Sequence, residues 1–261
     1  MRAGAARVDI TPPLPVDLLG YVRRDVAARR VHDPLLATGV LLQDDGGTVV
    51  IIAADLVNLA PAFAERVRER VAAAVSCRPE QVLLNSSHSH AAPWPGAGLK
   101  LGGETDDWTD RELGYWESLP DAFASVAVQA SHAAVEARVS GGVGHAPGLA
   151  VNRRERTADG RTILGWNPDG FIDDSVPTVR IDSLDGSAIA TLVGFGCHPV
   201  VVGPEVPAVG SDFVGPLRRR TEALRGGVAV FLQGAAGNVL PLEAFFDRTA
   251  RRWPSGSASA W

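Results

Sequence analysis

The stretch around which the chain is organised reads Gln81-Val82-Leu83-Leu84-Asn85-Ser86-Ser87-His88-Ser89-His90. Its first four residues form a short apolar run, which predicts a buried strand. Polar residues follow, and Pro93 and Pro95 prevent the ladder from continuing. Two imidazoles therefore come at the carboxyl end of a strand, where α/β proteins commonly build their sites. Because residues i and i+2 of a strand share a face, His88 and His90 are expected to point into one cleft.

The composition is that of an ordinary globular protein, with 261 residues, 46% of them hydrophobic and 21% charged. A net charge of −5 argues against nucleic acid as a partner. Two cysteines, Cys77 and Cys197, form neither a disulfide framework nor a cysteine-rich zinc site. No apolar run reaches transmembrane length, and the first residues lack the apolar core of a signal peptide. We therefore expect a cytoplasmic protein, or a secreted one if the true start is missing.

Periodicity around the opening stretch predicts a βαβ unit. Residues 48–54 are rich in β-branched side chains and predict a strand that ends at Asp55. A helical stripe follows, with an apolar residue at every fourth position: Phe63, Val67, Val71 and Val75. The strand at 81–84 comes next, so the two strands should be parallel neighbours. Asp55 and His88 would then lie at the same edge of the sheet.

The rest of the chain continues the α/β pattern. We expect strands at 6–10, 37–42, 139–145, 176–181, 188–197 and 228–233, helices at 119–136 and 216–225, loops at 96–118 and 165–170, and a polar segment that contains 152–156. His132 falls on the outer face of the first of these helices. The predicted fold class is α/β, with mixed β-sheets, flanking helices, βαβ elements and a site at the strand carboxyl ends. It occupies residues 1–245, and an irregular tail follows at 246–261.

A third histidine, His198, comes at the end of the predicted strand 188–197. Two histidines with one or two oxygen ligands would suit a zinc site, whereas the simpler alternatives are polar loop residues and a buried imidazole bonded to the backbone. Asp55 and Asp212 could orient a ligand histidine without binding the metal themselves, or merely cap a helix. The sequence has no Gly-x-Ser-x-Gly elbow and no phosphate-binding loop, which argues against a serine hydrolase of the α/β-hydrolase type and against a nucleotide-binding enzyme.

Several segments, taken in order, resemble the neutral/alkaline (non-lysosomal) ceramidase-like family. They are Ala3 to Pro13, Gly20-Tyr21, the stretch from Asn85 to His90, Asn152-Arg153, the strand ending at His198, and Gln233 to Pro241. The resemblance covers residues 3 to about 242, that is, most of the predicted catalytic region at 1–245. It implies a zinc-dependent hydrolase of an amide bond, acting on a small-molecule or lipid N-acyl substrate such as a ceramide.

The resemblance also implies a role for each matched residue. His88 and His198 would hold Zn²⁺, which activates a water molecule. His90 and Arg153 would contact the substrate carbonyl and stabilise its negative oxygen. Asn238 and Leu240 depart from the family, which has Asp and Ser at these positions.

The family completes its zinc shell with a Glu and a Tyr from a later region, which this sequence does not contain. We therefore expect a truncated or frame-shifted member of the family. The alternative function is a non-catalytic fragment of the same fold with an incomplete metal site. An unrelated α/β binding protein is the third possibility.

Overall fold

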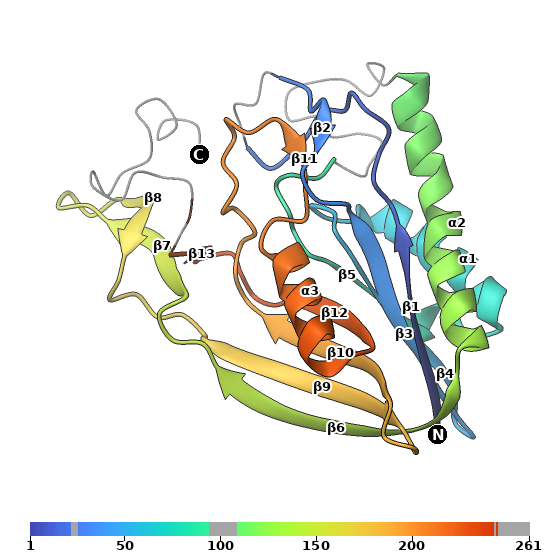
Figure 1. Cartoon of the computed structure of the whole chain (residues 1–261). Coiled ribbons are helices and arrows are strands. Elements are labelled where there is room, and N and C mark those ends of the chain that lie inside the picture. The colour runs from blue at the N-terminus through green and yellow to red at the C-terminus, as the bar shows by residue number, and fades with distance from the viewer. Residues whose placement is uncertain (22–25, 94–108, 243, 245–261) are drawn as a thin grey trace.

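The computed structural model describes residues 1–21, 26–93, 109–242 and 244. Its main feature is an eight-stranded mixed sheet in the order β12-β10-β9-β6-β1-β3-β4-β5 (Figure 1). These strands are β1 (Arg2–Asp9), β3 (Leu36–Asp44), β4 (Gly47–Ala54), β5 (Val82–Ser86), β6 (Val135–His145), β9 (Ser175–Ser183), β10 (Ala188–Phe195) and β12 (Val228–Gln233). The expected tail at 246–261 lies outside the described residues, whereas the α/β class with mixed sheets and flanking helices is confirmed.

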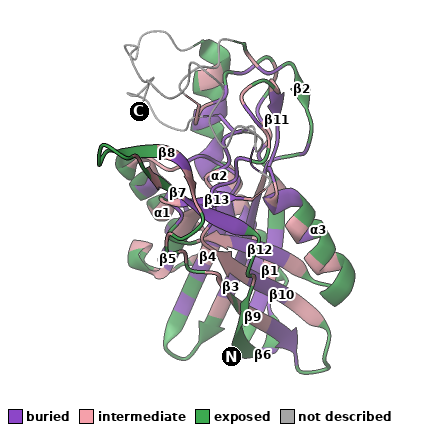
Figure 2. Cartoon of the chain, turned by 90° about the vertical axis from the view of Figure 1, so that its left-hand side faces the viewer, coloured by how far each residue is buried: buried purple, intermediate pink, exposed green. Residues whose placement is uncertain are grey.

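The sheet folds back on itself, so that β12 at one end contacts β3, β4 and β5 at the other. The two halves of the sheet are β12-β10-β9-β6 and β1-β3-β4-β5. An apolar core fills the space between them, with Val40 and Ala53 on one side and Leu192 and Val230 on the other. A second core lies between β1, β3, β4 and β5 and the helices α1 (Pro61–Val75) and α2 (Asp110–His132). Side chains of a strand alternate between its faces, so β3 and β4 supply both cores. Residues 37–41 of β3 are buried without interruption, as expected for a strand that is covered on both faces. Figure 2 shows where buried residues lie along the ribbon.

The predicted βαβ unit is confirmed. Strands β4 and β5 are parallel, and α1 connects them across the outer face of the sheet. Val67 and Val71 of the helical stripe are fully buried there. A short 3₁₀ turn, η1 (Pro79–Gln81), leads into β5. Asp55 and His88 therefore follow neighbouring parallel strands, at one edge of the sheet.

Helix α2 begins earlier than the sequence pattern predicted. We expected a loop up to residue 118, but the helix already starts at Asp110. The side chain of Thr109 accepts a hydrogen bond from the N–H of Glu112, and the Glu112 carboxylate accepts one from the N–H of Thr109. This capping box satisfies amide groups that the first turn would leave unpaired. The helix then continues through Pro120 to His132. None of the helices in the described segments is both long and apolar enough to cross a membrane.

Two segments for which no strand was predicted, the polar segment at 152–156 and part of the expected loop at 165–170, belong to a hairpin. Strands β7 (Ala150–Arg156) and β8 (Thr162–Asn167) pair antiparallel, and β13 (Val239–Pro241) adds to β7 as a third strand. The sequence signal failed because the second half of β7 consists of Arg and Glu residues, whose side chains are exposed or half-buried. Two further short strands, β2 (Arg30–Val31) and β11 (Ala208–Val209), pair in parallel. They link the loop between β1 and β3 to the loop between β10 and α3.

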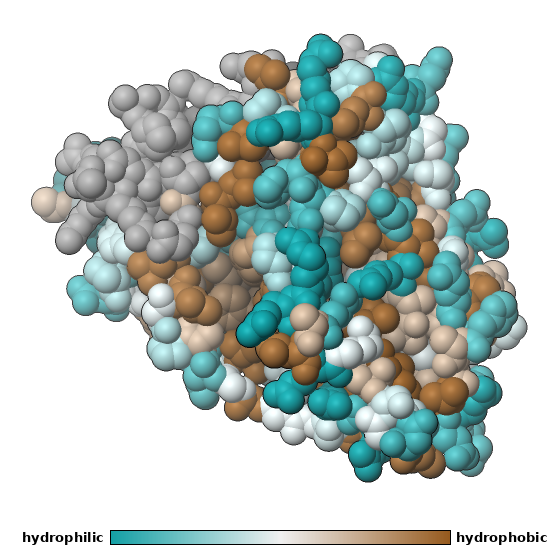
Figure 3. Space-filling view, viewed as in Figure 1, coloured by the Kyte–Doolittle hydropathy of each residue, from teal (hydrophilic) through white to brown (hydrophobic). Residues whose placement is uncertain are grey.

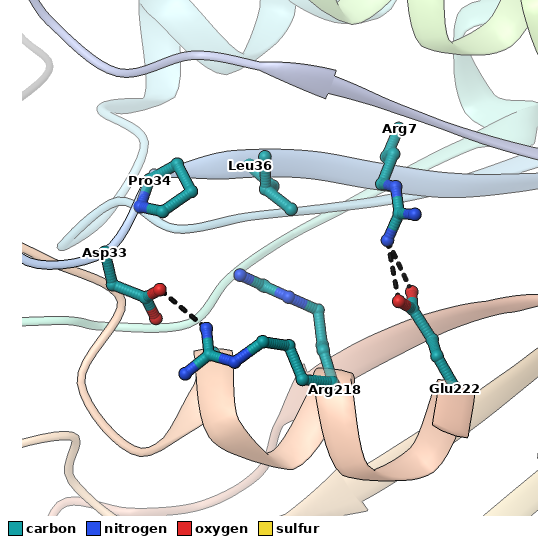
Figure 4. Close-up of a pocket in the computed structure, with 8 residues that line it drawn as sticks. Arg7, Asp33, Pro34, Leu36, Arg218 and Glu222 are labelled. Carbon is teal, nitrogen blue, oxygen red and sulfur yellow. Dashed lines mark hydrogen bonds and ion pairs between the residues drawn. The ribbon is translucent and has the colours of Figure 1, made fainter. Parts of the chain in front are cut away.

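Helix α3 (Val214–Arg225) packs against β12 and β10, and three of its side chains form ion pairs. Arg218 donates two hydrogen bonds to Asp55, at 2.7 and 2.5 Å, and both side chains are buried. Arg219 pairs with Asp33, and Glu222 pairs with Arg7 of β1. All of these charged residues except Asp55 line a cavity of about 250 Å³ between α3 and the sheet (Figure 4). Hydrophilic side chains gather over this helix on the face shown in Figure 3.

Candidate metal centre

The three histidines singled out in the sequence meet at the edge of the folded sheet. His88 and His90 follow β5, and His198 follows β10, which lies in the opposite half. The ring centroid of His88 lies 4.9 Å from that of His90 and 4.8 Å from that of His198. The centroids of His90 and His198 are 5.6 Å apart. The candidate ligand atoms all lie within 4.8 Å of one another. In a tetrahedral site with zinc–nitrogen bonds of about 2.0–2.1 Å, two ligand nitrogens lie about 3.3 Å apart, so side-chain rotations that bring the rings closer would let them share one ion.

The backbone brings His88 and His90 together in a different way from the one predicted. Strand β5 ends at Ser86, so the two residues do not share a strand face. His88 instead adopts a left-handed conformation with φ of 67°, which is uncommon outside glycine. The N–H of His90 then reaches the carbonyl oxygen of Pro199 at 3.4 Å. A turn, held against the loop after β10, therefore replaces the strand alternation that we expected.

Backbone carbonyl groups orient two of the three rings. The Nδ1 atom of His88 lies 2.7 Å from the carbonyl oxygen of Val57, and that of His198 lies 2.6 Å from the carbonyl oxygen of Ala236. A carbonyl oxygen can only accept a hydrogen bond, so each Nδ1 must carry the hydrogen. In the neutral ring this leaves the lone pair on Nε2. Such an arrangement is typical of metal-ligating histidines.

The surroundings keep these imidazoles neutral. Burial, the positive charge of Arg153 and the neighbouring His88 together lower the pKa of His198 from its ordinary value of 6.5 to about 3. Burial also lowers the pKa of His88, and Arg153 adds to this effect. A metal ion binds the unprotonated nitrogen, so both rings are in the form suited to a ligand at neutral pH.

Arg153 reaches the site because β7 pairs with β13. Its N–H donates to the carbonyl oxygen of Asn238 at 2.8 Å, and its Nε donates to the carbonyl oxygen of Gly237 at 3.0 Å. Burial and the adjacent Arg154 lower the pKa of Arg153 to about 10, so the guanidinium stays charged at neutral pH. The half-buried side chain thus places a positive charge close enough to affect both His88 and His198.

The hydrogen bonds described for the two aspartates go to other groups than the histidine rings. Asp55 accepts hydrogen bonds from the N–H of Leu36 and from Arg218. Asp212 accepts from the N–H groups of Val201, Val202 and Phe213, at 2.7–3.2 Å. Asp212 therefore fixes the backbone shortly after His198, and burial raises the pKa of its carboxyl group. That either aspartate orients a ligand ring directly stays a prediction.

Gly20 and Tyr21 pack against His90, a contact that the sequence did not reveal. Gly20 has a φ of +107°, and a Cβ atom there would lie 2.3 Å from Cγ of His90. The Tyr21 ring meets the His90 ring edge to face with centroids 5.0 Å apart, and its hydroxyl donates to the carbonyl oxygen of Val202 at 2.7 Å. The Gly20-Tyr21 pair was a signal in the sequence, but its partner is about 70 residues away and leaves no local pattern.

The fold occurs in known ceramidases. Models of protein families give no match to the sequence, and no curated protein matches it either. Among solved structures, the chain is similar to neutral ceramidase from Pseudomonas aeruginosa, with a TM-score of 0.77 at 19% identity, covering 92% of this chain and 39% of that one. It is also similar to a ceramidase complexed with C2, with a TM-score of 0.72 at 20% identity, covering 92% of this chain and 38% of that one. The chain thus spans about two fifths of these ceramidases, and over nearly all of its described length it has the ceramidase fold.

Proposed function

We propose that the chain forms part of a metal-dependent hydrolase that cleaves an amide bond in an N-acyl, ceramide-like substrate. The observation that carries the proposal is the meeting of His88, His90 and His198 from opposite halves of a ceramidase-like fold. The chemistry of these donors fits a zinc ion, since three imidazoles converge, two of them with their lone pair on Nε2. A bound zinc ion would act as a Lewis acid toward a water molecule and the substrate carbonyl.

The chain's own residues divide into two groups in this proposal. His88 and His198, which donate their Nδ1 hydrogens to carbonyl groups, hold the metal. His90 and Arg153 hold the substrate carbonyl and stabilise the negative charge that develops on its oxygen. The guanidinium suits this role because its Nε donates to the carbonyl oxygen of Gly237, and the main-chain N–H of the same residue donates to that of Asn238, so its position is fixed before a substrate arrives.

Metal content and hydrolysis together test the proposal. The purified chain should bind one zinc ion by elemental analysis, and mass spectrometry should detect release of a fatty acid from an N-acyl sphingosine. His88→Ala and His198→Ala should lose the metal, whereas His90→Ala should keep it and lose hydrolysis. His132→Ala is the matched control because His132 is exposed on α2. Absence of zinc in the wild-type chain would refute the proposal, and loss of zinc in His90→Ala would overturn the division of roles.

Arg153→Gln should leave the zinc content unchanged and lower kcat by a factor of about 10²–10³, the usual cost of removing one donor to a developing oxyanion. Arg154→Gln is the control, because the exposed Arg154 side chain neighbours Arg153 in the same strand. An unchanged kcat in Arg153→Gln would remove this residue from the proposed site.

A further inference from the structure

Two amide side chains join the ends of the folded sheet beside the histidines. Asn85 belongs to β5 and Gln233 to β12, which are the terminal strands at opposite ends of the strand order. They are 148 residues apart in the sequence. No strand pairing links them, so side-chain hydrogen bonds make the connection.

The Asn85 side chain takes the place of a neighbouring strand. Its Nδ2 donates to the carbonyl oxygen of Gln233 at 3.1 Å, and its Oδ1 accepts from the N–H of Gln233 at 2.9 Å. Both main-chain groups of Gln233 are thus satisfied as they would be in a β ladder. This reciprocal pair closes the gap between the two halves at the carboxyl ends of their strands.

The Gln233 side chain then continues to the two segments that carry the metal ligands. Its Nε2 donates to the carbonyl oxygens of Ser87 at 2.9 Å and Cys197 at 2.8 Å, and its Oε1 accepts from the N–H of Cys197 at 3.2 Å. Ser87 directly precedes His88, and Cys197 directly precedes His198. One side chain therefore binds the residue before each proposed ligand.

The carbonyl groups that orient the rings do not bridge the two halves. Val57 follows β4, in the same half as His88, and Ala236 follows β12, next to β10 in the half of His198. Each contact fixes a ring within its own half. The distance between the rings depends on how the halves are joined, and the contacts of Gln233 join them within one residue of each ligand.

We propose that Asn85 and Gln233 are positioning residues that set the separation of His88 and His198 and thereby the metal affinity of the site. This inference rests on the proposed metal site and gives a role to two residues to which the sequence pattern assigned none. Partners that orient ligands typically contribute a factor of about 10–100 to metal affinity. We expect a loss of this size when the side-chain amide of Gln233 is removed.

The test compares Gln233→Met, which keeps the length of the side chain without its hydrogen bonds, with wild type and with Gln43→Met. Gln43 lies at the opposite end of the sheet, beside the β3–β4 turn, and its side chain donates to Thr48. Zinc affinity is measured by competition with a chromophoric chelator, and the visible bands of bound Co²⁺ report the ligand geometry. Circular dichroism confirms that each variant is folded.

We expect Gln233→Met to bind zinc about 10–100-fold more weakly with altered Co²⁺ bands, and Gln43→Met to match wild type. If Gln233→Met does not fold, Asn85→Asp replaces it; this change keeps the acceptor for the N–H of Gln233 and removes the donor to its carbonyl group. Wild-type affinity and wild-type Co²⁺ bands in the folded variant would overturn this inference while leaving the metal site intact. If the wild-type chain bound no metal, the proposed function would fail and this inference with it.

Discussion

The buried, uncharged state of His198 makes a quantitative prediction about stability and pH. In the folded, metal-free protein the pKa of His198 is lowered from 6.5 to about 3, mainly by burial and then by Arg153. Between these two values the unfolded chain binds a proton that the folded chain does not. Stability must therefore rise with pH across this window and fall as the pH drops from 6.5 toward 3.

The magnitude follows from the distance between the assay pH and the unfolded pKa. A pH of 5 lies 1.5 units below the pKa of 6.5 that the imidazole has in the unfolded chain, and each unit corresponds to about 1.4 kcal/mol. His198 should thus lower the free energy of unfolding by about 2 kcal/mol at pH 5 relative to pH 7. The lowered pKa of His88 acts in the same direction.

Urea unfolding of the metal-free protein at pH 7 and pH 5 measures this effect. Other groups also titrate, so the test is the difference between wild type and His198→Asn, which cannot take up the proton. His132→Asn, on the exposed face of α2, should behave as wild type. If wild type and His198→Asn lost the same free energy between the two pH values, the reasoning from burial would be refuted.

Three further predictions concern the fold and the site. Asp55→Ala leaves Arg218 buried without its partner and should lower the free energy of unfolding by about 3–5 kcal/mol in denaturant titrations. The control Asp121→Ala removes an exposed ion pair and should lower it by less than about 1 kcal/mol. Equal effects of the two substitutions would contradict a stabilising role for the buried pair between Asp55 and α3. Gly20→Ala should both destabilise the protein and shift the NMR signals of the His90 imidazole, because Gly20 has a φ of +107° and a Cβ atom there would meet that ring. The control Gly186→Ala has a similar φ of +91° but open space around its Cβ position, so it should leave the His90 signals in place. Finally, removing zinc with a chelator should lower the thermal midpoint, because free metal at 100 times its dissociation constant adds about 2.7 kcal/mol; a midpoint that is independent of zinc would argue against a site in the folded protein.

The local pattern predicted the parts of the fold that depend on neighbouring residues. The stripe containing Val67 and Val71, between a β-branched run and a short apolar run, predicted the βαβ unit because helix and strand periodicities are properties of short windows. The same pattern predicted that His88 and Asp55 follow parallel strands. It missed β7, in which the charged residues carry no apolar pattern and the strand is fixed by its pairing with β8 and β13.

The sequence by itself determined where the imidazoles stand: at the ends of apolar runs, since a buried strand must stop where polar residues begin. Only the tertiary structure decided how they meet. The left-handed turn at His88, the approach of Arg153 through β13, and the joining of β5 to β12 by Asn85 and Gln233 each depend on partners far along the chain. Such contacts leave no periodic signal, because closing the sheet is a property of the whole core and not of any one segment.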